Sequence, residues 1–237
     1  MSSPPIERVI VGFKQRMRQF GFTRSNLRAQ LFQGLATDWL LALYLTRPKR
    51  KKLVSTGDPI RYGTIYLSVE QIQKKQIPGS LAECGVYQGK LSKFVHDLLP
   101  DRRLYLFDSF QGFNGSDSDS IGDNRFKDTS EQTVLNTLVK AGNVIIRKGF
   151  FPSTAAGLEA ERFSFVMIDF DKYESTRAAL DFFYQRMEQG GFIFVHDYSS
   201  PESNWACSRA LDEFLTDKSE KPILIPDSGG TAVFRKV

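Results

Sequence analysis

Acidic side chains stand at the ends of four strand-like runs in this chain of 237 residues. They are Glu83, Asp108, Asp169 and Asp197. If the runs are parallel strands of one sheet, their carboxyl ends share one edge. Ligands of open α/β sheets bind at that edge. The sequence therefore predicts an acidic binding site there.

The first of these runs leads into a turn that is suited to close approach by a ligand. Gly85 and Gly89 stand four residues apart in the sequence ECGVYQG, and a glycine lets the backbone come close to a bound molecule. The G-x-G-x-x-G pattern of dinucleotide sites is missing, which argues against a nicotinamide-dependent dehydrogenase. A carboxylate at Glu83 would repel a pyrophosphate, but it could attract the amino group of a methionine-like moiety.

The second run ends at Asp108, 19 residues after Gly89, which is the length of one strand–helix–strand step. One carboxylate at this position can accept hydrogen bonds from both hydroxyls of a ribose. The alternative is that Asp108 only caps a loop.

Asp169 and the pair His196-Asp197 follow two buried runs. If those runs are neighbouring strands, the side chains lie about 5 Å apart. Carboxylates so close repel each other unless a cation or a proton separates them. A divalent metal is one solution: carboxylates suit Mg²⁺ or Mn²⁺, and the imidazole favours Mn²⁺, Fe²⁺ or Zn²⁺. The second is a metal-free site in which His196 is a general base, and the third is a purely local role at the strand ends.

Alternating patterns predict the elements that would position these residues. Strands separated by helices indicate parallel pairing with helices on both faces, whereas two strands joined by a short Gly-Gly turn must be antiparallel. We expect five parallel strands, a helix and a closing antiparallel hairpin in one α/β sheet of seven strands. The expected strands are 80–84, 103–108, 143–148, 163–170, 191–196, 222–226 and 231–235, and the expected helices are 89–99, 130–141, 173–189 and 207–215.

The first 52 residues carry eleven Lys or Arg against two acidic residues, a charge of +9, and the remainder carries −4. We expect residues 1–60 to form a basic helical extension before a domain at 61–237, with 46–60 as a linker. The apolar stripe from Leu31 to Leu43 fits packing on the main domain or a dimer interface; peripheral membrane contact is a lesser option. No run is long enough to span a membrane, and two cysteines suit a reducing compartment, the cytoplasm.

Five motifs in order resemble the macrocin O-methyltransferase family, the S-adenosylmethionine-dependent enzymes that methylate sugar hydroxyls of macrolide and aminocoumarin antibiotics. The resemblance covers about residues 60–216. It rests on AECGVYQG (82–89), LFDSFQGF (106–113), KGFFPST (148–154), IDFDKYEST (168–176) and GGFIFVHDY (190–198). It implies a Rossmann-like class I methyltransferase fold.

The resemblance also implies roles for individual residues. The turn residues would contact the cofactor, with Glu83, Gly85 and Gly89 at its methionine end. Asp108 would hold the ribose, with Ser109 and Phe110 beside the adenosine, and Gly149 and Phe150 would lie near the reaction cleft. The turn residues are Glu83, Gly85, Val86, Tyr87 and Gly89.

Asp169 matches the first magnesium ligand of the family, and it is also a candidate cofactor and catalytic residue. The family then has two consecutive aspartates, 27 and 28 residues later, where this chain has His196 and Asp197. The macrolide enzymes are thought to use a histidine base in the loop after the second strand. Residues 109–129 contain no histidine here, so the base would be Asp169, His196 or another group.

The leading hypothesis is an O-methyltransferase that uses S-adenosylmethionine, with Mg²⁺ or Mn²⁺, to methylate a sugar hydroxyl in a glycoside or glycan. Its substrate would contact the 112–128 loop, the N-terminal arm and tyrosines such as Tyr62, Tyr87 and Tyr198. The alternatives are a methyltransferase for nucleic acid recruited by the basic arm and a non-catalytic binding module. No Asn-Pro-Pro-Tyr motif is present, which disfavours nucleic acid. We also expect a homo-oligomer.

Overall fold

The computed structural model describes residues 53, 56–113, 125–138 and 141–237. Contacts divide the chain into two units, Met1–Pro59 and Ile60–Val237. The predicted basic helical extension and its apolar stripe lie outside the described residues, apart from a few positions. Among the residues that the structure describes, none of the helices combines the length and apolar character needed to cross a bilayer.

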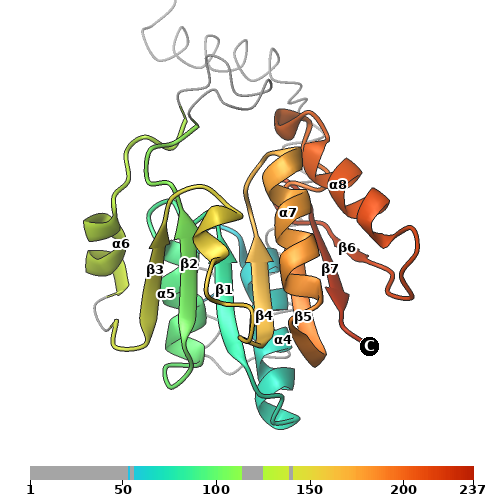
Figure 1. The fold of residues 1–237 in the computed structure, drawn as a ribbon, viewed down its shortest axis with the longest axis horizontal. Coiled ribbons are helices and arrows are strands. Elements are labelled where there is room, and N and C mark those ends of the chain that lie inside the picture. Colours follow the sequence, from blue (N-terminus) through green and yellow to red (C-terminus); the bar gives the residue numbers. More distant parts are fainter. Residues whose placement is uncertain (1–52, 54–55, 114–124, 139–140) are drawn as a thin grey trace, which may run out of the picture. The chain divides into compact units, whose positions relative to one another are not determined.

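Seven strands of the second unit form one sheet in the order β3-β2-β1-β4-β5-β7-β6 (Figure 1). Strands β1 to β5 pair in parallel, and β7 pairs antiparallel with both β5 and β6. This is the predicted mixed sheet with its terminal hairpin. The strands are β1 (Ser80–Cys84), β2 (Leu104–Asp108), β3 (Val144–Lys148), β4 (Phe163–Ile168), β5 (Met187–Val195), β6 (Ile223–Ile225) and β7 (Thr231–Arg235).

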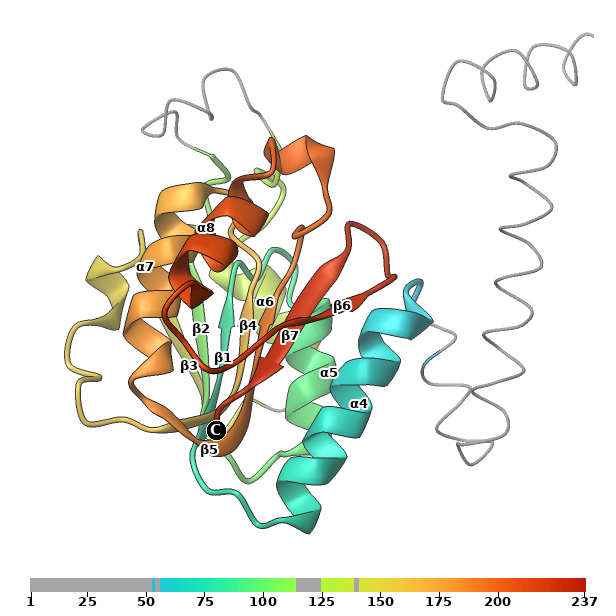
Figure 2. The same cartoon turned by 90° about the vertical axis from the view of Figure 1, so that its right-hand side faces the viewer.

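Helices cover both faces of the sheet (Figure 2). On one face α4 lies beside α5, where the rings of Tyr62 and Phe94 meet edge to face with centroids 4.9 Å apart. On the other face α7 packs against α8 and against β4 and β5. The helices are α4 (Pro59–Lys74), α5 (Lys90–Leu98), α6 (Glu131–Leu138), α7 (Tyr173–Tyr184) and α8 (Ala206–Leu215), with short 3₁₀ turns η2 (Ser153–Ala155) and η3 (Pro201–Ser203).

The central strands are apolar because both of their faces are covered. Every residue of β1 and β4 is buried, including the polar Glu83 and Ser164. Phe107, Phe163 and Phe183 form part of an aromatic core between the sheet and α7. The core thereby holds the carboxyl ends of β1, β2 and β4 in a fixed relation to one another.

The prediction of a helix over 173–189 was wrong at its end. Helix α7 stops at Tyr184, and β5 starts at Met187, so Gly190-Gly191 lies inside a strand and does not end the helix. Pairing of β4 with β5 shifts register between Phe163 and Phe165, and a Cβ on Gly191 would lie 2.8 Å from the Ser164 carbonyl oxygen. The glycine pair therefore permits close strand approach at an irregularity.

Candidate active site

The turn between β1 and α5 is pressed against the end of β4. Gly85 has a φ of +84°, and a Cβ on it would collide with the carbonyl oxygen of Asp169. Its N–H donates to the Phe107 carbonyl at 2.9 Å, and the Asp169 N–H donates to the Cys84 carbonyl at 2.8 Å. These bonds bring the ends of β1, β2 and β4 together, as the strand-end prediction requires.

Asp108 organises this turn through its carboxylate. One oxygen accepts hydrogen bonds from the N–H groups of Val86 at 2.7 Å and Tyr87 at 3.0 Å. The other accepts from the N–H of Phe110 at 2.7 Å. A carboxylate has about four lone-pair sites, so these three bonds leave one for a ribose hydroxyl. Asp108 therefore caps the turn and can still accept from a ligand.

Glu83 lies beneath the turn and is buried with 4% of its surface exposed. Its carboxyl group accepts a 2.5 Å hydrogen bond from the Ser92 hydroxyl. Burial raises its pKa to about 8, and the nearby carboxylates of Asp169 and Asp108 add to the rise. Glu83 does not line the cavity described below.

Asp169, His196 and Asp197 converge where β4 and β5 end, as predicted for neighbouring strands. The Nδ1 atom of His196 lies 3.1 Å from Asp169 Oδ1 and 3.3 Å from Asp197 Oδ1. Its Nε2 atom lies 2.9 Å from the Ser228 carbonyl oxygen. Both ring nitrogens face acceptors, so the ring carries two protons in this arrangement.

The charges of these residues follow from that geometry. Burial would lower the pKa of His196, but the Asp169 charge and hydrogen bonds to both carboxylates raise it to about 11. Burial would likewise raise the pKa of Asp197, but hydrogen bonds from His196 and Asp171 lower it to about 2. The imidazolium is thus the cation that separates two carboxylates.

Sequence reasoning missed Asp171, which is buried with 6% of its surface exposed. Burial, a hydrogen bond to Asp197 and neighbouring negative charges raise its pKa to about 9. Asp171 therefore holds a proton and donates it to the Asp197 carboxylate. Its position in the IDFD motif, three residues after β4 ends at Ile168 and two after Asp169, was the available signal.

Non-glycine residues with positive φ cluster around this site. Tyr87, Phe110, Asp171 and Asp197 have φ values of 50°, 55°, 61° and 55°. Such conformations are costly for L-residues, and they concentrate at functional sites that the surrounding structure holds in place. The cluster supports a functional reading of these strand ends.

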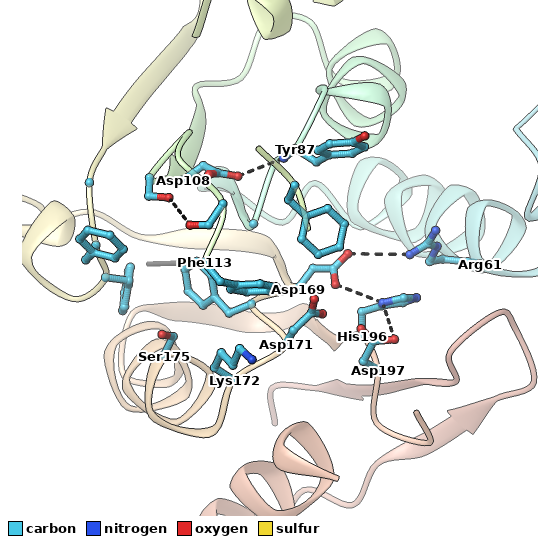
Figure 3. Close-up of a pocket in the computed structure, with 18 residues that line it drawn as sticks. Arg61, Tyr87, Asp108, Phe113, Asp169, Asp171, Lys172, Ser175, His196 and Asp197 are labelled. Atoms are coloured by element: carbon cyan, nitrogen blue, oxygen red, sulfur yellow. Dashed lines mark hydrogen bonds and ion pairs between the residues drawn. The ribbon is translucent and has the colours of Figure 1, made fainter. Parts of the chain in front are cut away.

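A cavity of about 320 Å³ opens at the strand ends (Figure 3). Nine of the predicted residues line it: Gly85, Tyr87, Asp108, Ser109, Gly149, Phe150, Asp169, His196 and Asp197. Glu83, Val86, Gly89 and Phe110 do not line it. The lining also includes Phe113 and Phe126, which belong to the 112–128 loop expected to contact the substrate. Sequence reasoning did not single out the other lining residues Arg61, Phe151, Phe170, Asp171, Lys172 and Ser175.

A second cavity of about 570 Å³ adjoins the first. Four residues line both: Phe126, Asp171, His196 and Asp197. Its remaining wall comes mainly from the turn after β5 and the β6–β7 hairpin, including Ser199, Ser200, Asp227 and Ser228. Of the predicted substrate tyrosines, Tyr87 lines the first cavity, Tyr62 is buried against Phe94, and the Tyr198 hydroxyl donates to Asp212 at 2.8 Å.

The three convergent side chains also fit a divalent cation. Their donor atoms lie within 4.8 Å of one another. The Nε2–H of His196 donates to a backbone carbonyl, which is the usual partner of the outer nitrogen of a metal-bound histidine. After loss of one proton, Nδ1 would be the ligand beside two carboxylate oxygens.

Comparison with known proteins identifies the group to which this fold and site belong. The model of the macrocin O-methyltransferase (TylF) family matches residues 56–236. The chain belongs to the macrocin O-methyltransferase family. The site residues predicted from its motifs all lie within the matched part.

Two curated relatives and one solved structure illustrate the family. The 8-demethyl-8-(2,3-dimethoxy-α-L-rhamnosyl)-tetracenomycin-C 4′-O-methyltransferase of Streptomyces olivaceus is 29% identical over 173 residues, covering 65% of this chain and 64% of that protein. The mycinamicin III 3″-O-methyltransferase of Micromonospora griseorubida is 30% identical over 174 residues, covering 65% and 67%. The O-methyltransferase NovP is 25% identical, with a TM-score of 0.64, covering 76% of this chain and 80% of NovP. The match thus spans about two thirds of the length of the curated relatives.

Proposed function

We propose that this protein is an S-adenosylmethionine-dependent O-methyltransferase that acts on a hydroxyl of a sugar in a glycoside or glycan. Family membership supports the transfer of a methyl group to oxygen. The name of the Streptomyces olivaceus relative, which specifies a rhamnosyl group on tetracenomycin C, supports a sugar acceptor.

The observation that carries the proposal is the pair of adjoining cavities with one shared wall. The first is lined by the glycine turn and Asp108, which suit the donor. The second is lined by serines and the β6–β7 hairpin, which suit a hydroxyl-rich acceptor. Because His196 and Asp197 line both, donor and acceptor would meet beside them.

The residues of the first cavity would bind and orient the donor. Asp108 would accept from a ribose hydroxyl, and Gly85 leaves room for close backbone approach. Aromatic rings of Phe113, Phe126 and Phe150 would exclude water from the donor. When bound, S-adenosylmethionine supplies a methyl group on a sulfonium, and holding two reactants in line lowers the barrier to transfer.

The acceptor hydroxyl must lose its proton, and the site offers carboxylates for this step. The ring of His196 has no free lone pair with which to act as a base: in this arrangement both nitrogens hold protons, and with a metal bound Nδ1 would be a ligand. Asp169 or Asp197 would accept the proton directly, and His196 would position both carboxylates. This geometry argues against the metal-free alternative in which His196 is the base.

Divalent-metal assistance is part of the proposal. Asp169, His196 and Asp197 would hold the ion, and a bound Mg²⁺ or Mn²⁺ would orient the hydroxyl and make it more acidic. The proposals of nucleic-acid recruitment, membrane contact and oligomer formation depend largely on residues outside the described part of the chain, and they stay predictions.

Calorimetry with S-adenosylhomocysteine tests the proposed function. We expect saturable binding by the unchanged protein and at least tenfold weaker binding by Asp108→Ala, since that variant loses both the ribose acceptor and the turn that it caps. Asp101→Ala, an exposed aspartate just before β2, is the matched control and should bind normally. Absence of binding by the unchanged protein, or equal affinity of all three proteins, would contradict the proposal.

A further inference from the structure

Arg61 reaches the cofactor cavity from the first turn of α4, an element that the motifs do not include (Figure 3). Its guanidinium Nη1 lies 3.8 Å from Asp169 Oδ2. The other oxygen of the same carboxylate, Oδ1, faces His196 at 3.1 Å. Asp169 thus turns one oxygen to the candidate cation site and the other to Arg61.

The surroundings of this ion pair are strongly acidic. The charge of Arg61 acts on three neighbouring groups. It limits the rise in the pKa of Glu83 and of His196, and it adds to the fall in the pKa of Asp197. A free carboxylate that entered this end of the cavity would be repelled by Asp169 and Asp197 unless a cation received it. A guanidinium has five donors in a planar fork, so Arg61 can hold Asp169 and a second carboxylate side by side.

The remaining cations of the described cavity lining are placed for other contacts. Lys172 Nζ lies 4.4 Å from the centre of the Phe113 ring. The N–H groups of His196 point to Asp169, Asp197 and the Ser228 carbonyl. Arg61 is therefore the lining cation whose charge stands beside Asp169 at the acidic end.

The sheet order sets which end of the cofactor meets this pair. Asp108 ends β2 and Gly149 follows β3, on one side of the β1 turn, and Asp169 follows β4 on the other. With the ribose at Asp108, the amino-acid end of the cofactor extends past Gly85 toward β4. That end is a zwitterion, which needs an anion and a cation side by side.

We infer that Arg61 and Asp169 form a binding pair for this zwitterion, in which Arg61 binds the α-carboxylate and Asp169 receives the α-ammonium group. The inference rests on the proposed function, because it assumes the same cofactor. Recognition of the α-carboxylate of the cofactor is thereby assigned to α4 and not to the glycine turn. Arg61 would thereby favour a cofactor with its intact amino-acid end over an analogue that lacks the α-carboxylate.

The test compares S-adenosylhomocysteine with its decarboxylated analogue, 5′-S-(3-aminopropyl)-5′-thioadenosine, by calorimetry. The unchanged protein should bind S-adenosylhomocysteine at least tenfold more tightly than the analogue, as is typical of a charge-assisted hydrogen bond. Arg61→Gln should lose that preference, with weaker binding of S-adenosylhomocysteine and little change for the analogue. Arg61→Lys should keep part of the preference, since it retains the charge and loses the fork.

Lys172→Gln is the matched control, because it removes a cation from the same cavity. Its effect on the two ligands should be equal, so that the preference is unchanged. Thermal unfolding of each variant checks that the fold is intact. If Arg61→Gln keeps the full preference, or if the unchanged protein has none, this inference is wrong while the proposed function stands. If neither ligand binds to the unchanged protein, the proposed function fails as well.

Discussion

At the scale of single residues, the site is organised by one imidazole between two carboxylates. The resemblance to the family motifs places an aspartate at the position of His196, and the Nδ1 atom of His196 occupies the point on which Asp169 and Asp197 converge. Replacing a carboxylate by an imidazole removes one negative charge and supplies a nitrogen donor. Nitrogen donors favour Mn²⁺ over Mg²⁺, which prefers oxygen.

We expect the protein to bind Mn²⁺ more tightly than Mg²⁺, with each metal titrated alone by calorimetry. His196→Asp should restore an all-oxygen donor set and reduce the ratio of the two affinities by roughly tenfold, because it removes the nitrogen ligand. His196→Asn, which brings no added charge, is the control and should bind both ions weakly. The same affinity ratio in His196→Asp and in the unchanged protein would rule out His196 as a ligand.

At the scale of elements, the close approach of the β1 turn to the end of β4 is what brings the site residues together. Gly85 permits this approach in two ways, through its positive φ and through the absence of a Cβ beside the Asp169 carbonyl oxygen. Gly157 also has a positive φ, +81°, but nothing lies within 4 Å of the Cβ position. Alanine substitution at the two glycines therefore distinguishes the cost of the backbone conformation alone from that cost plus a steric clash.

Gly157→Ala should lower the free energy of unfolding by about 1 kcal/mol, which is typical for placing alanine in a left-handed conformation. Gly85→Ala should cost at least about 3 kcal/mol, because the strand end must also move. Urea denaturation measures both values, and failure of Gly85→Ala to fold would agree with the larger cost. Equal costs in the two variants would show that the contact with β4 does not constrain the turn.

Most element boundaries could be predicted from periodicity, because buried parallel strands are short apolar runs. Ser80–Cys84 and Thr231–Arg235 agree with the structure residue for residue. The end of α7 could not be predicted, because a Gly-Gly pair after a helix resembles a stop signal, and its role in β5 depends on the irregular pairing with β4 between Phe163 and Phe165. Helix α4 was not predicted, and its Arg61 gives no local signal of a site.

At the scale of the described molecule, two buried glutamates make stability depend on pH in opposite directions. Burial raises the pKa of Glu83 to about 8 from 4.5. Burial would also raise that of Glu220, but hydrogen bonds from Lys236 and Tyr184 lower it to about 2. The contribution of Glu83 to the free energy of unfolding is present below pH 4.5 and is lost as the pH rises through 8. The contribution of Glu220 is present above pH 4.5 and is lost as the pH falls toward 2.

Urea denaturation across a pH series separates the stability contributions of Glu83 and Glu220. Glu83→Gln should reduce the loss of stability between pH 5 and 8, since the amide can accept from Ser92 without a charge to bury. Glu220→Gln should instead reduce the loss of stability below pH 4.5, at the cost of its ion pair with Lys236. Each variant is the control for the other, and a similar effect of both in one pH range would contradict the assignment.

The hydrogen bond between His196 Nε2 and the Ser228 carbonyl has a consequence for how the specificity for the acceptor could change. The hairpin that supplies Ser228 is distant in sequence from the glycine turn and Asp108, yet it forms a wall of the second cavity. New acceptors could then be accommodated by altering Ile225 to Gly230 while the donor half of the molecule is left intact. Residues 225–230 would then be the variable part of the hairpin, while the Ser228 carbonyl keeps its contact with His196 and β7 keeps its pairing with β5.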